Sequence, residues 1–224
     1  MLKYKCGGIY AFTSTVSCLK RRVTMAKKII TISREFGSGG RSIGRAVAEK
    51  LGYKFYDQEL IMHVAEESGL SKEIVEKYDE YATHKNSFLY SIAVNAGGDA
   101  YGGLSFANQV QIAQSNVIKA IADEGNCVIV GRGADYILRD REDCLHVFIR
   151  ADMKSRAERV VKLYGETDKK IEDRLRDKDT KRKVFYRSFT MREWGLCENY
   201  DISLDSAKIG IDKCVDIIVD IAKA

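Results

Sequence analysis

The residues that could do chemistry are most concentrated in one glycine-rich segment. Residues 33–44 read SREFGSGGRSIG and connect an apolar run to a helical pattern. Glycines let backbone N–H groups turn toward an anion, and a helix that begins at such a turn adds the positive end of its dipole. The segment therefore predicts a loop that binds the phosphates of a nucleotide, with the contacts made by Gly37, Ser38, Gly39, Gly40, Arg41 and Ser42.

This segment departs from the standard phosphate-loop pattern G-x-x-x-x-G-K-[ST]. Gly40 and Ser42 fit the pattern, whereas Glu35 stands in place of the first glycine and Arg41 in place of the lysine. Arg41 would supply a permanent charge and a two-pronged donor instead of a compact ammonium group. Ser42 is the expected Mg²⁺ ligand, through its hydroxyl. The alternative interpretation is a glycine-rich turn from strand to helix with no ligand.

Two further candidates follow apolar runs elsewhere in the chain. Asp57 follows the run 53–56 and is either an acceptor-site residue or the N-cap of a helix that begins near Glu59. Arg132 stands between two glycines directly after the run 127–130. That position predicts a guanidinium at the carboxyl edge of a sheet, where open α/β sheets bind ligands. The alternative for Arg132 is a structural pair with a carboxylate, and Asp135 is the nearest in sequence.

A basic segment lies in the last quarter of the chain. Residues 174–192 contain eight lysines and arginines against two aspartates, Asp177 and Asp179. Such a run is usually a solvated helix face. In a phosphoryl-transfer enzyme it would instead form a lid that brings guanidinium groups onto the transferring phosphate, because that chemistry depends on electrostatic clamping.

The elements that must position these residues alternate between strands and helices. Apolar runs predict strands at 29–32, 53–56, 127–130, 145–149 and 201–204. Helical spacing predicts helices at about 43–51, 59–83 with a break near Gly69, 106–123, 152–164, 168–187 and 209–222, and a glycine-rich loop covers 95–103. Strands that are apolar on both faces and alternate with helices indicate a parallel sheet covered on two sides, a three-layer α/β fold.

Composition narrows the function classes. The net charge is +5, but residues 1–28 contain seven basic residues and no acid, so the rest of the chain carries −2 and a nucleic-acid partner is not expected. Residues 1–24 are interpreted as an extension without a fold, either a disordered tail or a segment before a native start at Met25. Scattered cysteines and isolated histidines exclude a zinc site and fit a reduced cytoplasmic setting. No apolar run approaches 18 residues, so no membrane span is expected.

Four blocks of sequence resemble the cytidylate kinase-like family, whose phosphate loop reads GSGG followed by arginine. In chain order they are ISREFGSGGRSIGRAVAEKLGYKFYDQELI, VIVGRGADYIL, HVFIRADMKSRAERV and DKDTKRKVFYRSFTMREWGLCENYDISLDSAKIG. The resemblance implies a P-loop NTPase fold, makes Arg41 an expected variant and Arg132 a phosphate contact, and places Asp57 at the entrance to the acceptor site. Asp179 and Arg182 match the acid and arginine of the family's lid. Leu175 stands where the family has a further lid arginine, at a position tied to cytosine recognition.

We therefore expect residues 25–224 to form a single kinase domain, with an acceptor-binding helical region at about 58–124 and a lid at about 166–196. The expected reaction moves the γ-phosphoryl group of ATP, with Mg²⁺, to CMP, dCMP or a similar small acceptor. Arg41, Arg132 and Arg182 are the expected catalytic residues, and Asp57, Arg132, Asp179 and Arg182 the expected substrate contacts. The alternatives are a kinase for a different small acceptor, with Asp57 as general base, and a nucleotide-binding regulator without turnover. The oligomeric state is left open.

Overall fold

A computed structural model describes residues 26–57 and 106–224. Its five strands form one parallel sheet in the order β2-β3-β1-β4-β5. The strands are β1 (Ile29–Arg34), β2 (Lys54–Tyr56), β3 (Cys127–Val130), β4 (Cys144–Arg150) and β5 (Ile202–Asp205). All five predicted strands are confirmed, within one or two residues at their ends.

The helices of the described residues also follow the predicted pattern. Those predicted are α1 (Gly40–Leu51), α5 (Phe106–Glu124), α7 (Met153–Tyr164), α8 (Ile171–Thr190) and α10 (Ile211–Lys223). Three short elements were not predicted, because a single turn carries too little periodicity to detect: α6 (Ala134–Ile137), the 3₁₀ helix η1 (Cys197–Asn199) and α9 (Ser206–Ile209). The helices expected at 59–83 and the loop at 95–103 lie outside the described residues.

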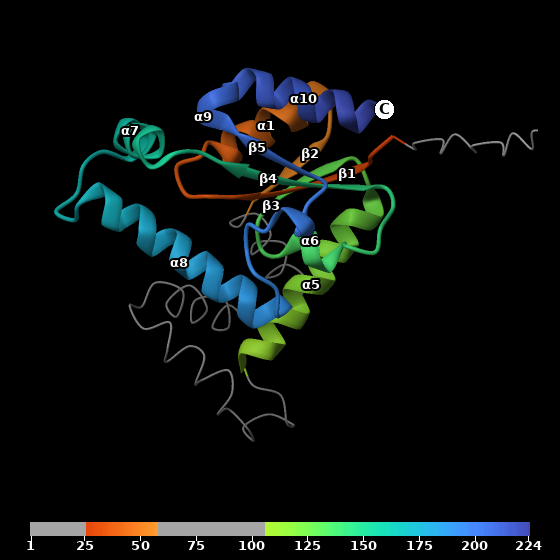
Figure 1. The fold of residues 1–224 in the computed structure, drawn as a ribbon. Helices are drawn as coiled ribbons and strands as arrows, with labels where there is room; N and C mark the ends of the chain where they lie inside the picture. The colour runs from red at the N-terminus through yellow and green to blue at the C-terminus, as the bar shows by residue number, and fades with distance from the viewer. Residues whose placement is uncertain (1–25, 58–105) are drawn as a thin grey trace, which may run out of the picture.

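The sheet is the middle one of three layers (Figure 1). Ile30 and Ile32 of β1 pack with α1 and α10 on one face, whereas Ile29 packs with α5 and α6 on the other. All three side chains are fully buried. Burial on both faces is why the strands read as continuous apolar runs. The predicted three-layer α/β architecture with a parallel sheet is therefore confirmed.

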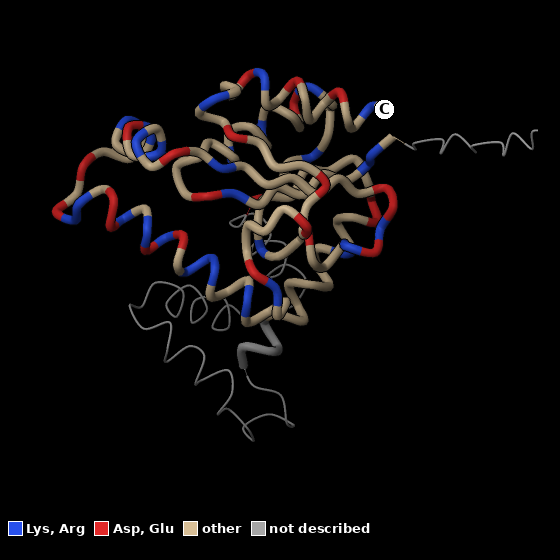
Figure 2. Tube along the Cα trace, viewed as in Figure 1, with Lys and Arg blue, Asp and Glu red and all other residues tan. Residues whose placement is uncertain are grey.

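Helix α8 passes along the carboxyl end of the sheet. It contacts the chain just after β1 through Asp179 and just after β3 through Tyr186. Lysines and arginines recur along the helix, and acids are mixed with them only in its first half (Figure 2). The helix ends at Met191, which adopts the left-handed conformation with φ 58°. The basic segment found in the sequence is thus a helix placed beside the phosphate loop.

An aromatic cluster holds the chain that follows α8 against the sheet. The ring of Trp194 meets Phe148 of β4 edge-on, with centroids 5.3 Å apart, and Tyr200 packs on the same ring at 5.0 Å. Trp194 is therefore a packing residue. In the described parts of the chain, no helix combines the length and apolar character that crossing a membrane requires.

Candidate active site

The predicted phosphate loop connects β1 to α1. Gly39 is the N-cap of α1 with φ 83°, and Gly37 has φ 79°; both lie in the left-handed region that favours glycine. The first bond of the helical ladder runs from the N–H of Ile43 to the carbonyl of Gly39, at 2.9 Å. The N–H groups of the first helical turn come before this bond in the chain, so they are positioned to bind an anion.

A cavity of about 310 Å³ lies over this loop. It brings together most of the residues expected from the sequence to form a site, and their side chains come from β1, the loop, α1, the end of β2, α7 and α8. The lining residues are Arg34, Glu35, Phe36, Gly37, Gly39, Gly40, Arg41, Ser42, Asp57, Arg159, Val160, Leu163, Tyr164 and Arg182. Ser38 belongs to the loop but is fully buried, and its hydroxyl donates to the carbonyl of Glu35 at 2.9 Å.

Arg41 and Asp57, which both line the cavity, form an ion pair. The Nε and Nη2 groups of Arg41 both donate to Oδ2 of Asp57, at 2.9 and 2.5 Å. The arginine side chain is 47 % exposed and the aspartate side chain 11 %. Asp57 thus lies at the phosphate loop, whereas the helix that it was expected to cap falls outside the described residues.

Arg182 of α8 reaches the start of the same loop. Its Nη1 group donates to the carbonyl of Arg34 at 3.0 Å, and its guanidinium lies 5.6 Å from the centre of the Phe36 ring. Burial lowers the pKa of Arg182, and the nearby carboxylate of Asp179 opposes that shift. This places the arginine that was expected to clamp the transferring phosphate on the wall of the cavity.

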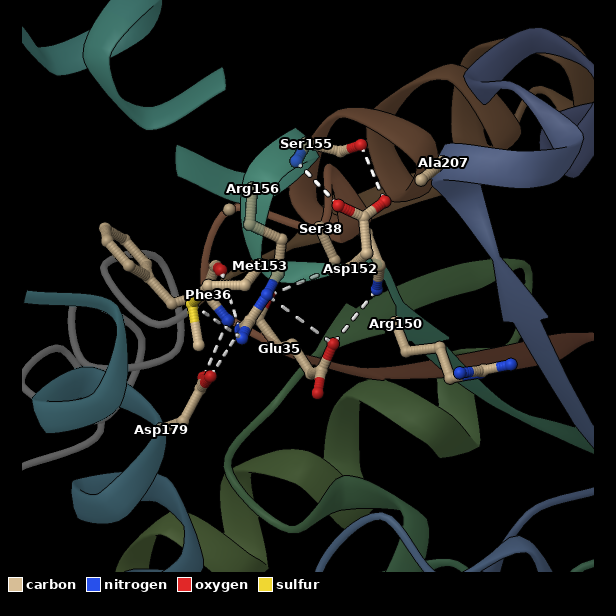
Figure 3. A network of polar contacts seen from close by, with 12 residues as sticks. Glu35, Phe36, Ser38, Arg150, Asp152, Met153, Ser155, Arg156, Asp179 and Ala207 are labelled. Carbon is tan, nitrogen blue, oxygen red and sulfur yellow. Dashed lines mark hydrogen bonds and ion pairs between the residues drawn. The ribbon is translucent and has the colours of Figure 1, made fainter. Parts of the chain in front are cut away.

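Asp179 binds the loop backbone and a buried arginine (Figure 3). Its Oδ1 accepts a hydrogen bond from the N–H of Phe36 at 2.7 Å, and its Oδ2 pairs with Nη1 of Arg156. Asp179 and Arg156 are 8 % and 6 % exposed, so the pair is buried. The role of Asp179 as a substrate contact stays a prediction, while its structural role is to join α7 and α8 to the loop.

The same network explains Glu35, which departs from the phosphate-loop pattern. Its Oε2 accepts from the N–H of Ala151 at 3.0 Å and lies 3.8 Å from Nε of Arg156 (Figure 3). A glycine in this position could not make either contact. Glu35 therefore ties the loop to the residue that follows β4 and to Arg156.

Two site residues of the described chain, Arg34 and Arg159, were missed by the sequence reasoning. Arg34 ends β1 and lines the cavity; burial and the charges of Arg182 and Arg132 lower the pKa of its guanidinium, against a smaller opposing effect of Asp57. Arg159 of α7 donates to the carbonyl of Gly37 at 2.6 Å. Both reach the loop by tertiary placement, and the only signal for Arg159 was its presence in a block that resembles the family.

Arg132 lies next to this group at the end of β3. It adopts φ 58°, and its carbonyl accepts from Nε2 of Gln114 at 3.1 Å. Asp135, suggested by the sequence as its partner, accepts instead from the hydroxyls of Ser33 at 3.1 Å and Tyr186 at 2.7 Å. Burial raises the pKa of Asp135 even though both hydroxyls favour its charged form.

The residues present fit a magnesium ion bound mainly by phosphates. Among residues 26–57 and 106–224, no three His, Cys, Asp or Glu side chains are grouped so that they could hold a metal. Ser42 is exposed in the first turn of α1 and lines the cavity. Mg²⁺ at such sites takes one or two protein oxygens and completes its shell with phosphate oxygens and water.

Comparisons with known proteins agree with this geometry. The model of the cytidylate kinase-like family matches residues 29–208. A cytidylate kinase of Archaeoglobus fulgidus is 27 % identical over 194 residues, which cover 85 % of this chain and 92 % of that protein. A cytidylate kinase of Pyrococcus horikoshii is 24 % identical over 183 residues, or 81 % of each chain. The crystal structure of an uncharacterized protein of Eubacterium ventriosum superposes with a TM-score of 0.65 at 27 % identity, covering 88 % of this chain and 98 % of that one.

Proposed function

The chain belongs to the cytidylate kinase-like family, and from that premise we propose that it transfers the γ-phosphoryl group of ATP to CMP, dCMP or a similar small anionic acceptor. The observation that carries the proposal is one cavity that holds the phosphate loop, Arg41, Asp57 and Arg182 together. The two related cytidylate kinases support the choice of acceptor.

In this proposal the loop binds the donor. The amides at the start of α1 hold the phosphates, and Ser42 contributes a hydroxyl to Mg²⁺, which when bound neutralises part of the phosphate charge. Arg41, Arg132 and Arg182 supply further positive charge around the transferring group. Because charge is spread over the phosphoryl oxygens in the transition state, such clamping is the main catalytic contribution.

The acceptor would enter at the end of β2, where Asp57 lies. A phosphate oxygen of a nucleoside monophosphate is already an anion and needs no general base. An acceptor hydroxyl would need one, but Asp57 is held in an ion pair with Arg41, which lowers its value as a base. The pair therefore favours a phosphate acceptor over a hydroxylated metabolite.

The base of the acceptor is a separate question. Leu175, which stands at the position of the family's further lid arginine, is fully buried. A fully buried leucine cannot form hydrogen bonds with a cytosine base. We propose that the region 58–124 selects the acceptor.

An ADP-release assay with MgATP tests the proposal. CMP, dCMP, UMP, AMP and a set of small hydroxylated metabolites are offered as acceptors, and thermal melting with ATP is followed in parallel. We expect turnover with CMP or dCMP, and ATP at about 100 times its dissociation constant should add about 2.7 kcal/mol of stability. Turnover with a hydroxylated metabolite alone would indicate a different kinase, whereas ATP binding without any product would indicate a regulator.

A further inference from the structure

We propose that Arg34, and not Arg41, supplies the cation that the lysine of a standard phosphate loop places on the donor phosphates. This inference rests on the function proposed above and assigns a residue within the same site. It arises from how two glycines accommodate the side chain of Arg34.

The first glycine is Gly40, at the start of α1. A Cβ atom at this position would lie 2.5 Å from Cβ and 3.0 Å from Cγ of Arg34. The base of the arginine side chain therefore occupies the space in which a side chain of residue 40 would begin. If the pattern G-x-x-x-x-G-K-[ST] is placed one residue earlier than above, Gly39 is its second glycine and Gly40 falls on the lysine, while Arg34 falls on the first glycine and Arg41 on the serine or threonine. In that alignment the lysine is missing, and Arg34 fills its place from the neighbouring strand.

The second glycine is Gly131, at the end of β3. A Cβ atom there would lie 1.9 Å from Nη1 of Arg34, closer than two such atoms can approach. The guanidinium thus lies against Gly131, the residue before Arg132, where only a glycine leaves room. Gly40 therefore leaves space for the base of the Arg34 side chain, and Gly131 leaves space for its guanidinium.

Arg41 is placed differently. Two of its nitrogens donate to Asp57, and nearly half of its side chain is exposed. Its charge is therefore partly balanced by a carboxylate at the proposed acceptor entrance. This position suits a contact with the acceptor better than one with the donor phosphates.

The charges around Arg34 also call for an anion. Burial lowers the pKa of Arg34, and the guanidinium groups of Arg182 and Arg132 lower it further, against a smaller opposing effect of Asp57. Arg182 also donates to the backbone carbonyl of Arg34. Like charges gathered at a partly buried site repel one another until an anion offsets them. A triphosphate in the cavity would provide that charge, and its β- and γ-oxygens would gain most from Arg34 during transfer. In the reaction the bond between Pγ and the β-bridging oxygen breaks, a bond from the acceptor oxygen to Pγ forms, and ADP leaves with the electron pair.

Matched substitutions of the two arginines test the inference. We expect Arg34→Met to lower kcat by about 10²-fold or more and to weaken ATP binding. We expect Arg41→Met to raise the KM of the acceptor while changing ATP affinity by less than about threefold. Circular dichroism and thermal melting confirm that each variant is folded.

A rescue experiment separates a direct role from a structural one. Arg34→Gly removes the cation, and Arg34→Gly combined with Gly40→Lys restores a lysine at the standard position with space for its side chain. We expect the kcat of the double variant to be at least tenfold higher than that of Arg34→Gly. A purely structural role for Arg34 would not produce this recovery.

The outcomes distinguish this inference from the function on which it rests. Wild-type protein that binds ATP while Arg34→Met binds it equally well would overturn the inference alone. A large loss of ATP affinity in Arg41→Met but not in Arg34→Met would assign the cation to Arg41. Wild-type protein that neither binds ATP nor releases ADP with any acceptor would overturn the proposed function and this inference with it.

Discussion

The carboxylate of Asp179 accepts a hydrogen bond from the backbone N–H of Phe36 at 2.7 Å. These residues lie 143 positions apart in the sequence, one in the middle of α8 and the other in the phosphate loop. The remaining oxygen of the carboxylate pairs with Arg156 of α7. The loop is thus held by two helices that follow it late in the chain.

Asp179→Asn should lower the free energy of unfolding by about 3 kcal/mol, because it removes the closer of the two carboxylates that pair with the buried charge of Arg156. The amide oxygen of asparagine can still accept from Phe36, so the loss reports on the charge pair. Urea denaturation measures the effect. On the same helix, Asp177 pairs with Lys169 at the surface, and Asp177→Asn should cost less than about 1 kcal/mol. Equal losses in the two variants would contradict the buried pair as the source of stability.

Arg182→Ala should lower kcat by about 10³-fold, because it removes a guanidinium from the wall of the cavity around the transferring phosphate. Steady-state kinetics in the ADP-release assay measure the loss. Lys183 is adjacent in the sequence and exposed, so Lys183→Ala serves as the control and should leave kcat within about twofold. A comparable fall in both variants would mean that the overall charge of α8, and not Arg182, matters.

Ser206→Ala should destabilise the protein by about 1–3 kcal/mol, the cost of leaving a buried acceptor without its donor. The hydroxyl of Ser206 donates to the carbonyl of Ser38 at 2.5 Å, and both side chains are buried. Because this bond fixes the phosphate loop, the KM for ATP should rise as well. Ser188 is exposed on α8 and bonds only within its own helix turn among the contacts described; Ser188→Ala should change neither quantity. A loss of stability with an unchanged KM for ATP would show that the bond between Ser206 and Ser38 does not affect ATP binding by the loop.

Stability should fall as the pH drops below about 6.5, in part through His146. This residue is 9 % exposed, its Nδ1 lies 2.8 Å from the hydroxyl of Thr31, and burial lowers its pKa against the opposing charges of Asp201 and Asp135. A folded-state pKa below the unfolded value of about 6.5 means that the unfolded chain takes up the proton first, so stability is full above that pH and is lost below it.

Urea denaturation of wild type and His146→Gln between pH 5 and 7.5 checks this prediction. As the pH falls, the free energy of unfolding should decrease less for His146→Gln than for wild type. The raised pKa of Asp135 acts in the opposite direction, since it favours the folded state at low pH. It is present in both proteins and largely cancels in the comparison. Parallel curves for the two proteins would show that His146 does not contribute.

Much of this fold could be predicted from local patterns. Each buried strand is a short apolar run, and the amphipathic spacing of Ile43 and Val47 located α1 directly after the glycines. Arg41 and Asp57, which line the cavity, could be singled out because they stand beside such signals, and Arg182 because it lies in a basic segment that resembles the family. Arg34 ends a strand without any local mark, and Arg156 reads as one charge among many on α7. Their places depend on packing between distant segments, which no periodicity in a single sequence encodes.

Because the chain is synthesised from its N-terminus, the phosphate loop is made well before the residues that hold it in place. The glycine motif is complete by residue 44, yet the side chains that bind its backbone come from Arg159, Asp179, Arg182 and Ser206. A ribosome-bound chain that stops before α7 would carry every residue of the motif and none of these supports. Nucleotide affinity should therefore emerge only near the end of synthesis, and truncations that retain the motif should bind ATP poorly.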